Sequence, residues 1–152
     1  MKLESISVFF PAYNDQATIG GLVEKAFQVL AGTGREFEVL VVDDGSRDQT
    51  PAVLERLQSR YGDRFRVVRH AVNRGYGAAL RSGMEAARKD LVFYTDGDGQ
   101  YDPAELSAAG VPAARRGTGQ RLQDRAPRSV PPDRHRKALQ RRGAVAVRNL
   151  AA

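Results

Sequence analysis

The chain has 152 residues, a length that suits one domain with a substantial hydrophobic core. It contains no cysteine and only two histidines, which excludes a disulfide framework, a thiol nucleophile, a thiolate zinc site and a histidine-rich metal cluster. No apolar run is long enough to span a bilayer and the first residues lack a signal-peptide pattern, so we expect a cytoplasmic protein.

The net charge of +6 is unevenly distributed. Residues 108–152 carry ten arginines and one lysine against two aspartates, a net charge of +9, whereas residues 1–107 carry a net charge of −3. All eleven aromatic residues lie between Phe9 and Tyr101. We therefore divide the chain into an α/β segment, residues 1–107, and a basic tail, residues 108–152, which we expect to be poorly ordered.

Short apolar runs rich in β-branched and aromatic residues predict four buried strands. They cover Ile6–Phe10, Phe37–Val42, Phe65–Val68 and Leu91–Thr95. Helical periodicity between them predicts three helices. These run from Thr18 to about Ala31, from Thr50 (as N-cap, with Pro51 at the first helical position) to about Tyr61, and over Ala78–Arg88. Regular alternation of strand and helix implies parallel βαβ units in a doubly wound, mainly parallel sheet.

Polar clusters follow the first, second and fourth of these strands. They are Asn14 and Asp15; Asp43 and Asp44; and Asp96, Asp98 and Gln100. Ligands of such sheets bind beyond the carboxyl ends of the strands, so we expect the three clusters to converge at one edge.

The segment Asp96–Pro103 is the strongest single signal. Its first five residues, Asp-Gly-Asp-Gly-Gln, offer two carboxylates and an amide, the oxygen ligands that Mg²⁺ and Mn²⁺ prefer. An EF-hand loop opened by Asp96 is excluded, because its sixth and twelfth positions hold Tyr101 and Ser107 instead of glycine and glutamate. Metal-assisted chemistry on a phosphorylated substrate is the resulting hypothesis.

A dinucleotide-binding Rossmann domain and a P-loop enzyme are both disfavoured. The loop after the first strand, Pro11–Asp15, lacks the glycines of either phosphate-binding turn. Gly75 and Gly77 follow the third strand, and Leu80 stands where the last glycine of a Rossmann turn belongs.

Four segments in order carry a family resemblance. They are Phe10–Asp15, Val41–Thr50, Asn73–Gly77 and Asp96–Pro103. Together they resemble the signature of family 2 glycosyltransferases with the GT-A fold, in particular the branch similar to dolichol- or polyprenyl-phosphate mannosyl- and glucosyltransferases. The resemblance covers roughly residues 5–107, and four motifs in order are far more specific than one.

The resemblance implies roles for the site residues. Asp15 matches an acidic residue near the nucleotide, usually glutamate, and Asp44 matches the carboxylate that binds the base or ribose. Asp43 is interpreted as capping its turn, and Tyr13 either lines the nucleotide pocket or packs against the sheet edge. The set that the resemblance assigns to the nucleotide-sugar is Pro11, Tyr13, Asp15, Asp44 and Asp96. The set that it assigns to Mg²⁺ or Mn²⁺ is Asp96, Asp98 and Gln100.

The activity implied is transfer of a hexose from a GDP- or UDP-linked donor to a polyprenyl phosphate or another acceptor, at the inner face of the membrane. The sequence assigns no catalytic base. In related enzymes that carboxylate lies beyond the metal motif, and after Asp102 and Glu105 this chain offers no convincing candidate. Nucleic acid is not an expected partner.

The tail departs from the family pattern, which continues with apolar acceptor-site segments. An excess of Arg, Ala, Pro and Gly is typical of GC-rich coding sequence read out of frame. We interpret residues 108–152 in this way, and therefore expect a truncated enzyme that binds nucleotide weakly and transfers little sugar.

Two other classes of protein are alternatives. A nucleotidyltransferase also presents carboxylates to Mg²⁺, but it should have a glycine- and basic-rich loop that Pro11–Asp15 does not supply. A basic nucleic-acid-binding protein would depend wholly on the tail.

Overall fold

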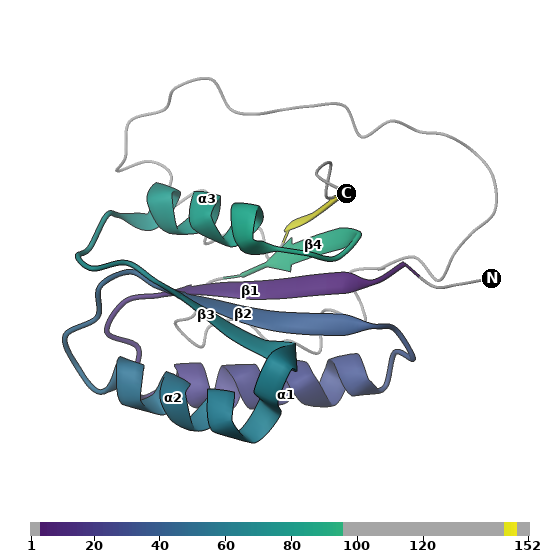
Figure 1. The fold of residues 1–152 in the computed structure, drawn as a ribbon, viewed down its shortest axis with the longest axis horizontal. Helices are drawn as coiled ribbons and strands as arrows, with labels where there is room; N and C mark the ends of the chain where they lie inside the picture. Colours follow the sequence, from purple (N-terminus) through teal and green to yellow (C-terminus); the bar gives the residue numbers. More distant parts are fainter. Residues whose placement is uncertain (1–3, 96–144, 149–152) are drawn as a thin grey trace.

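The structure, a computed structural model, describes residues 4–95 and 145–148 (Figure 1). The strands are β1 (Ile6–Ala12), β2 (Phe37–Asp43), β3 (Phe65–Arg69), β4 (Leu91–Tyr94) and β5 (Val145–Arg148). The helices are α1 (Ile19–Ala31), α2 (Thr50–Tyr61) and α3 (Tyr76–Ala86), with a short 3-10 helix, η1 (Gly62–Arg64), before β3.

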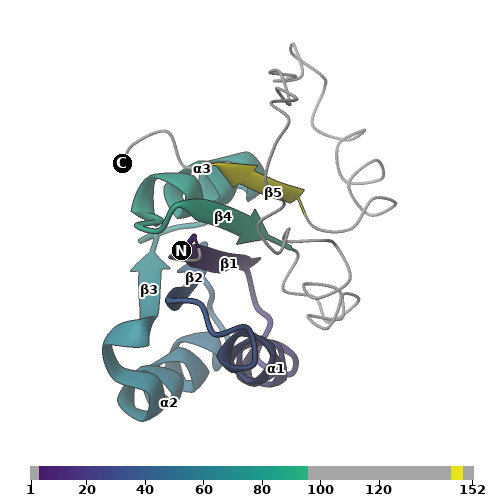
Figure 2. The same ribbon diagram turned by 90° about the vertical axis from the view of Figure 1, so that its right-hand side faces the viewer.

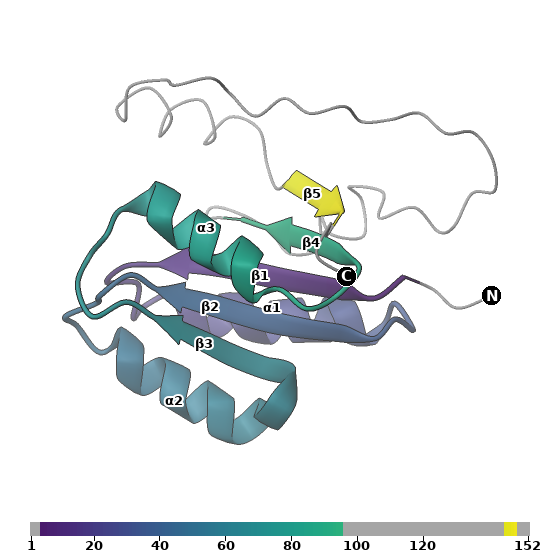
Figure 3. The ribbon, with the colours of Figure 1, turned by 45° about the horizontal axis from the view of Figure 1, so that its top comes forward.

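The described strands form one sheet in the order β3-β2-β1-β4-β5. Strands β1 to β4 are parallel, with Phe9 of β1 paired with Leu40 of β2 and Tyr94 of β4. Helices α1 and α2 cover one face of the sheet and α3 covers the other (Figures 1 and 3). The predicted fold class, an α/β doubly wound and mainly parallel sheet, is therefore confirmed.

The two faces of the sheet bury separate hydrophobic clusters, as the two-residue period of a strand requires. Val8 and Phe10 of β1 pack with α1 and α2, whereas Phe9 packs beneath α3. Gly83 permits the close approach of α3, because a Cβ there would lie 2.3 Å from the Phe9 ring. Both helix layers are thereby fixed against the central strand.

Strand β1 is longer than its sequence predicts. Pro11 should close the strand at Phe10, yet β1 continues through Pro11 to Ala12. The Phe9 carbonyl accepts a hydrogen bond from the Thr95 N–H on the β4 side, and Pro11, two residues later, faces the same side. Since β4 ends at Tyr94, opposite Phe9, the missing N–H of Pro11 removes no ladder bond.

Strand β5 was not predicted, because the sequence reading treats residues 108–152 as a poorly ordered tail. Residues Val145–Arg148 pair antiparallel with Leu91–Tyr94 and extend the sheet by one edge strand (Figure 2).

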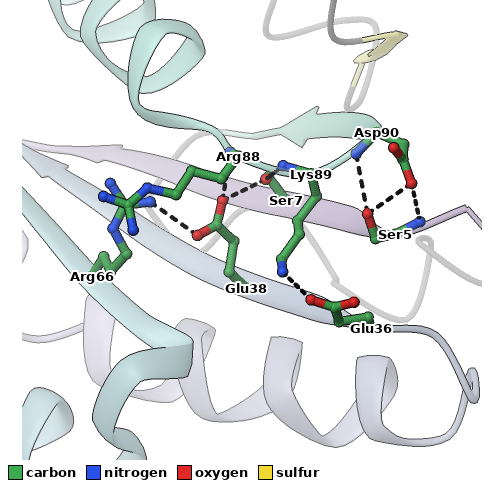
Figure 4. A network of polar contacts seen from close by, with 8 residues as sticks. All are labelled: Ser5, Ser7, Glu36, Glu38, Arg66, Arg88, Lys89 and Asp90. Carbon is green, nitrogen blue, oxygen red and sulfur yellow. Dashed lines mark hydrogen bonds and ion pairs between the residues drawn. The ribbon is translucent and has the colours of Figure 1, made fainter. Parts of the chain in front are cut away.

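A polar network joins the starts of the parallel strands to the connection between α3 and β4 (Figure 4). Its centre is the buried carboxylate of Glu38, which accepts hydrogen bonds from Ser7 Oγ at 2.7 Å, the Arg88 N–H at 2.7 Å and the Arg66 guanidinium at 2.9 Å. Asp90 accepts hydrogen bonds from both the N–H and the Oγ of Ser5, each at 2.8 Å. The network therefore fixes where β4 begins relative to β1 and β2.

Two opposing effects act on the pKa of Glu38. Burial raises the pKa of its carboxyl group, but the hydrogen bonds from Ser7, Arg88 and Arg66 together outweigh burial and hold that pKa below its ordinary value. A carboxyl group whose pKa is lower in the folded than in the unfolded chain stabilises the fold above the unfolded pKa. That stability is lost as the pH falls through the folded pKa.

We predict that Glu38→Gln destabilises the fold at pH 7 by about 1.5–3 kcal/mol, because the amide loses the charge-assisted bond to Arg66 and brings an N–H group against existing donors. The unfolding free energy of the variant should also fall less than that of the wild type as the pH is lowered from 7 to 3. Urea denaturation between pH 3 and 7 measures both effects.

The matched control is Glu36→Gln. Glu36 pairs with Lys89 in the same network, but 60% of its side chain is exposed. This change should alter the unfolding free energy by less than about 1 kcal/mol. Equal effects at the two positions would contradict the role given to Glu38.

Candidate functional site

The carboxyl ends of β1, β2 and β3 carry loops that lie at one edge of the sheet (Figure 1). The strand order reverses between β1 and β4, so the crevice between these two ends is a topological switch point, the usual ligand position in such sheets. Thr95, beside β1, is the last described residue before the predicted metal segment. Asp96, Asp98 and Gln100 themselves lie outside the described residues.

The loops after β1 and β2 interlock through side-chain to backbone hydrogen bonds. Asn14 Oδ1 accepts from the Arg47 N–H at 2.8 Å, and the Asn14 N–H donates to Ser46 Oγ at 3.0 Å. Asn14 has a φ of +53°, a left-handed conformation that asparagine tolerates better than most residues. Gln16 Oε1 in turn accepts from the Gln49 N–H at 2.8 Å. The two loops therefore form one surface.

Asp15 organises the loop after β1 and joins it to α2. Its Oδ2 accepts a hydrogen bond from the Tyr13 N–H at 2.9 Å, and its own N–H donates to Thr50 Oγ1 at 2.9 Å. Thr50 was predicted to cap α2 but is its first residue, and Asp48 Oδ1 accepts the Thr50 N–H at 2.8 Å instead. Asp48 and Thr50 thus organise the start of the helix.

Asp43 caps its turn, as the sequence predicts. Its Oδ1 accepts a hydrogen bond from the Ser46 N–H at 3.0 Å, and its Oδ2 lies 3.5 Å from Nε of Arg69. The Asp43 backbone carbonyl accepts from the His70 N–H at 2.9 Å. Asp43 therefore stabilises the loops at this edge through internal contacts, and only 1% of its side chain is exposed.

The adjacent Asp44 joins three elements. Its Oδ1 lies 2.6 Å from Nδ1 of His70, which follows β3, and accepts the Arg74 N–H at 2.8 Å. Its Oδ2 accepts the Gly75 N–H at 2.8 Å, where α3 begins. Asp44 is buried, so these three bonds replace most of its contact with water. The residue predicted to meet the nucleotide therefore also holds the β3–α3 loop.

The same contacts set the charge of Asp44. Burial raises the pKa of its carboxyl group, but the hydrogen bonds from His70, Arg74 and Gly75 outweigh burial and keep that pKa below its ordinary value. Asp44 is consequently ionised at neutral pH, and its charge lies near the amino end of α3, where the helix dipole favours an anion.

His70 is a site residue that the sequence reading missed. Its ring is buried, with Nδ1 on Asp44 and Nε2 lying 2.8 Å from Ser82 Oγ of α3. One available signal was its position, because His70 directly follows β3 at the carboxyl edge of the sheet.

The remaining predicted residues differ in exposure. Pro11 is buried within β1, whereas 45% of Tyr13 is exposed at the edge. Tyr76, at the start of α3, is also exposed, as is Val72 in the loop before it. Exposed apolar surface therefore borders the loops that carry Asp15 and Asp44.

Within residues 4–95 and 145–148, no group of three or more His, Cys, Asp or Glu side chains is placed to hold a metal ion. The metal ligands predicted from the sequence fall outside these ranges. In the same part of the chain, no helix has the length and apolar character needed to cross a membrane.

A parallel α/β sheet with polar loops gathered at a switch point is the architecture of nucleotide-binding folds. The model of one family, described as glycosyl transferase family 2, matches residues 7–142. The chain belongs to this family.

Two relatives of known activity are similar to this chain over about two thirds of its length. The chain is 38% identical over 106 residues to an undecaprenyl-phosphate 4-deoxy-4-formamido-L-arabinose transferase of Pseudomonas paraeruginosa, a match covering 68% of this chain and 31% of that protein. It is 34% identical over 102 residues to the human dolichyl-phosphate beta-glucosyltransferase, covering 63% of this chain and 32% of that protein. The chain thus spans about a third of the length of the curated relatives it matches.

A solved structure of similar fold is glucosyl-3-phosphoglycerate synthase from Mycobacterium tuberculosis, in complex with Mn²⁺, UDP and glucosyl-3-phosphoglycerate. The TM-score is 0.55 at 27% sequence identity, and the match covers 68% of this chain and 37% of that chain. The predicted GT-A glycosyltransferase fold is therefore confirmed.

We predict that Gly45→Ala disrupts the edge. Gly45 has a φ of +74°, and a Cβ there would lie 2.5 Å from the backbone N of Asn73 and the carbonyl carbon of Val72. The variant should lose about 2 kcal/mol or more of unfolding free energy, from strain and from separation of two backbones. Denaturant unfolding gives the value.

Gly34→Ala is the matched control. Gly34 has a similar φ of +67°, but a Cβ there meets nothing within 4 Å. It should lose only the cost of the left-handed conformation, about 1 kcal/mol. If both variants lose the same amount, the packing of the β2–α2 loop on the β3–α3 loop has no measurable energetic role.

Proposed function

We propose that this chain is the donor-binding part of a glycosyltransferase that moves a hexose from a GDP- or UDP-linked donor to a polyprenyl phosphate. This proposal rests on the combination of the chain's family with the arrangement of its loops. In this family 2 chain the loops after β1, β2 and β3 lie together at the carboxyl edge of the sheet, beside the switch point between β1 and β4. The Asp96-Gly97-Asp98 motif follows β4 in the sequence.

In this proposal the nucleotide-sugar meets Pro11, Tyr13, Asp15, Asp44 and Asp96. The exposure of Tyr13 supports a role in lining the nucleotide pocket, because a residue packed on the sheet would be covered. Asp15 and Asp44 supply carboxylates on adjoining loops, and carboxylate oxygens suit the N–H and O–H donors of a base or ribose.

The proposed metal ligands are Asp96, Asp98 and Gln100. Their oxygen donors fit a hard divalent cation such as Mg²⁺ or Mn²⁺, and a solved neighbour contains Mn²⁺ with UDP. When bound, the cation would neutralise the charge of the departing diphosphate.

The choice of acceptor follows the relatives, whose names specify undecaprenyl and dolichyl phosphates. A phosphate oxygen is already anionic and nucleophilic, so its attack needs no general base. The chain would then need only to hold the donor in line with the acceptor. We place this reaction at the inner face of the membrane, where a lipid-linked phosphate meets a cytoplasmic donor.

The proposal gives no function to residues 108–152, which we regard as an out-of-frame segment in place of the acceptor-site part. The resulting expectation is nucleotide binding with little or no transfer. Reading the coding sequence in its other frames tests this: a family-like apolar segment must continue past the α/β part, and its absence would contradict the proposal.

We predict that the chain binds UDP or GDP in the presence of Mn²⁺, and that Asp98→Asn weakens this binding by about tenfold or more, because a metal ligand loses its charge. Calorimetry with and without Mn²⁺ measures the affinity.

Asp63→Asn is the control, since Asp63 is an exposed acid of η1 before β3, at the opposite edge of the sheet. This variant should bind like the wild type. Binding that is insensitive to Mn²⁺ and to Asp98→Asn would contradict the metal assignment. Rapid transfer to a polyprenyl phosphate would contradict the expected lack of acceptor machinery.

A further inference from the structure

We propose that His70 is a positioning residue of the nucleotide site. It fixes the direction in which Asp44 offers a hydrogen-bond acceptor, and through Asp44 it fixes the loop that begins α3. This inference depends on the proposed function for its ligand, a uridine or guanosine diphosphate, but its structural basis is independent of that function.

The first step is the chemistry of the His70 ring. An ionised carboxylate only accepts hydrogen bonds, so the proton on the 2.6 Å contact belongs to Nδ1 of His70. In the neutral imidazole, Nε2 then accepts the hydroxyl proton of Ser82, at 2.8 Å. Both ring nitrogens are engaged, and both His70 and Asp44 are 5% exposed in their side chains. The ring is therefore held in one orientation.

The second step is the count of acceptor positions on Asp44. A carboxylate has about four lone-pair positions. His70 and the Arg74 N–H occupy Oδ1, and the Gly75 N–H occupies one position of Oδ2. In this arrangement the fourth position lies on Oδ2, where a ring N–H or a ribose hydroxyl could bind. Without His70, the carboxylate could turn and expose either oxygen.

The third step concerns the loop. Arg74 and Gly75 directly precede α3, and the Asp44 carboxylate holds both of their N–H groups. His70 bonds to the same carboxylate and, through Ser82, to the body of α3. One buried ring thus couples the end of β2, the end of β3 and α3.

The order Ser82–His70–Asp44 matches the hydrogen-bond order of a Ser–His–Asp catalytic triad. A hydrolytic role is not supported, because Ser82 lies well inside α3. The N–H groups of Ser82 and Gly83 are committed to the helix and cannot form an oxyanion hole. Ser82 instead serves to orient the imidazole.

Two substitutions separate the contacts of His70. In His70→Asn the amide nitrogen can replace Nδ1 and donate to Asp44, whereas in His70→Gln it reaches the place of Nε2 beside Ser82. Hydrogen exchange at the Arg74 and Gly75 amides reports on the loop, and calorimetry with UDP and Mn²⁺ on the full chain reports on the site. Thermal unfolding verifies that each variant is folded.

We expect His70→Asn to retain amide protection and to bind UDP within about threefold of the wild type. His70→Gln should lose protection at both amides and bind roughly tenfold or more weakly, the effect of losing a hydrogen bond to a charged group. Ser82→Ala, which leaves the bond to Asp44, should have a smaller effect than His70→Gln.

Equal behaviour of the two His70 variants would overturn the proposal, as would a loss in Ser82→Ala as large as that in His70→Gln. If His70→Gln does not fold, Asp44→Asn tests the third step instead, since an amide cannot accept at both oxygen positions; retained protection of the Arg74 and Gly75 amides in that variant would also overturn the proposal. A wild-type chain that binds no nucleotide refutes the proposed function alone, because amide exchange still decides the role of His70.

Discussion

The carboxylate of Asp44 is the interaction on which the candidate site depends. It lies at the end of a buried strand, where burial alone would favour its neutral form, yet three hydrogen bonds keep it ionised. Those bonds come from His70 and from the amino end of α3, so the charge also holds two other elements in place. Gly45 completes the arrangement, because only a residue without a Cβ lets the next loop approach so closely. The Asp44 carboxylate therefore both supplies a negative charge at this edge and holds the loops around it in place.

The opposite edge of the sheet has a corresponding anchor in Glu38. There the buried carboxylate bonds to the Arg88 N–H and to Arg66, while Ser5 holds Asp90 (Figure 4). These contacts fix the start of β4. Because β4 is only four residues long and pairs with β1, the position of its start also determines the position of its end beside β1. The end of β4, which precedes the proposed metal segment in the sequence, therefore has a position determined from the far edge of the sheet.

The sequence predicted the β1–β4 and α1–α3 elements because their apolar periodicities are strong and their loops contain glycine, proline and aspartate. It also predicted that Asp43 caps a turn. It did not predict β5, whose four residues carry too little pattern, or the role of His70, since one histidine gives no spacing signal and its partners lie 12 and 26 residues away in sequence. The family resemblance predicts that Asp44 contacts the nucleotide. The three bonds that Asp44 makes within the chain depend on tertiary packing that no local pattern encodes.

The central claim is that the loops after β1, β2 and β3 form one nucleotide-binding edge beside β4. Amide chemical-shift mapping of the ¹⁵N-labelled chain, titrated with UDP and Mn²⁺, tests it most directly. The account predicts that saturable shifts concentrate at Tyr13–Asp15 and Arg74–Gly75, with little change at Arg88–Asp90 on the opposite edge. Shifts that avoid the carboxyl-edge loops, or that are equally large at both edges, would contradict it.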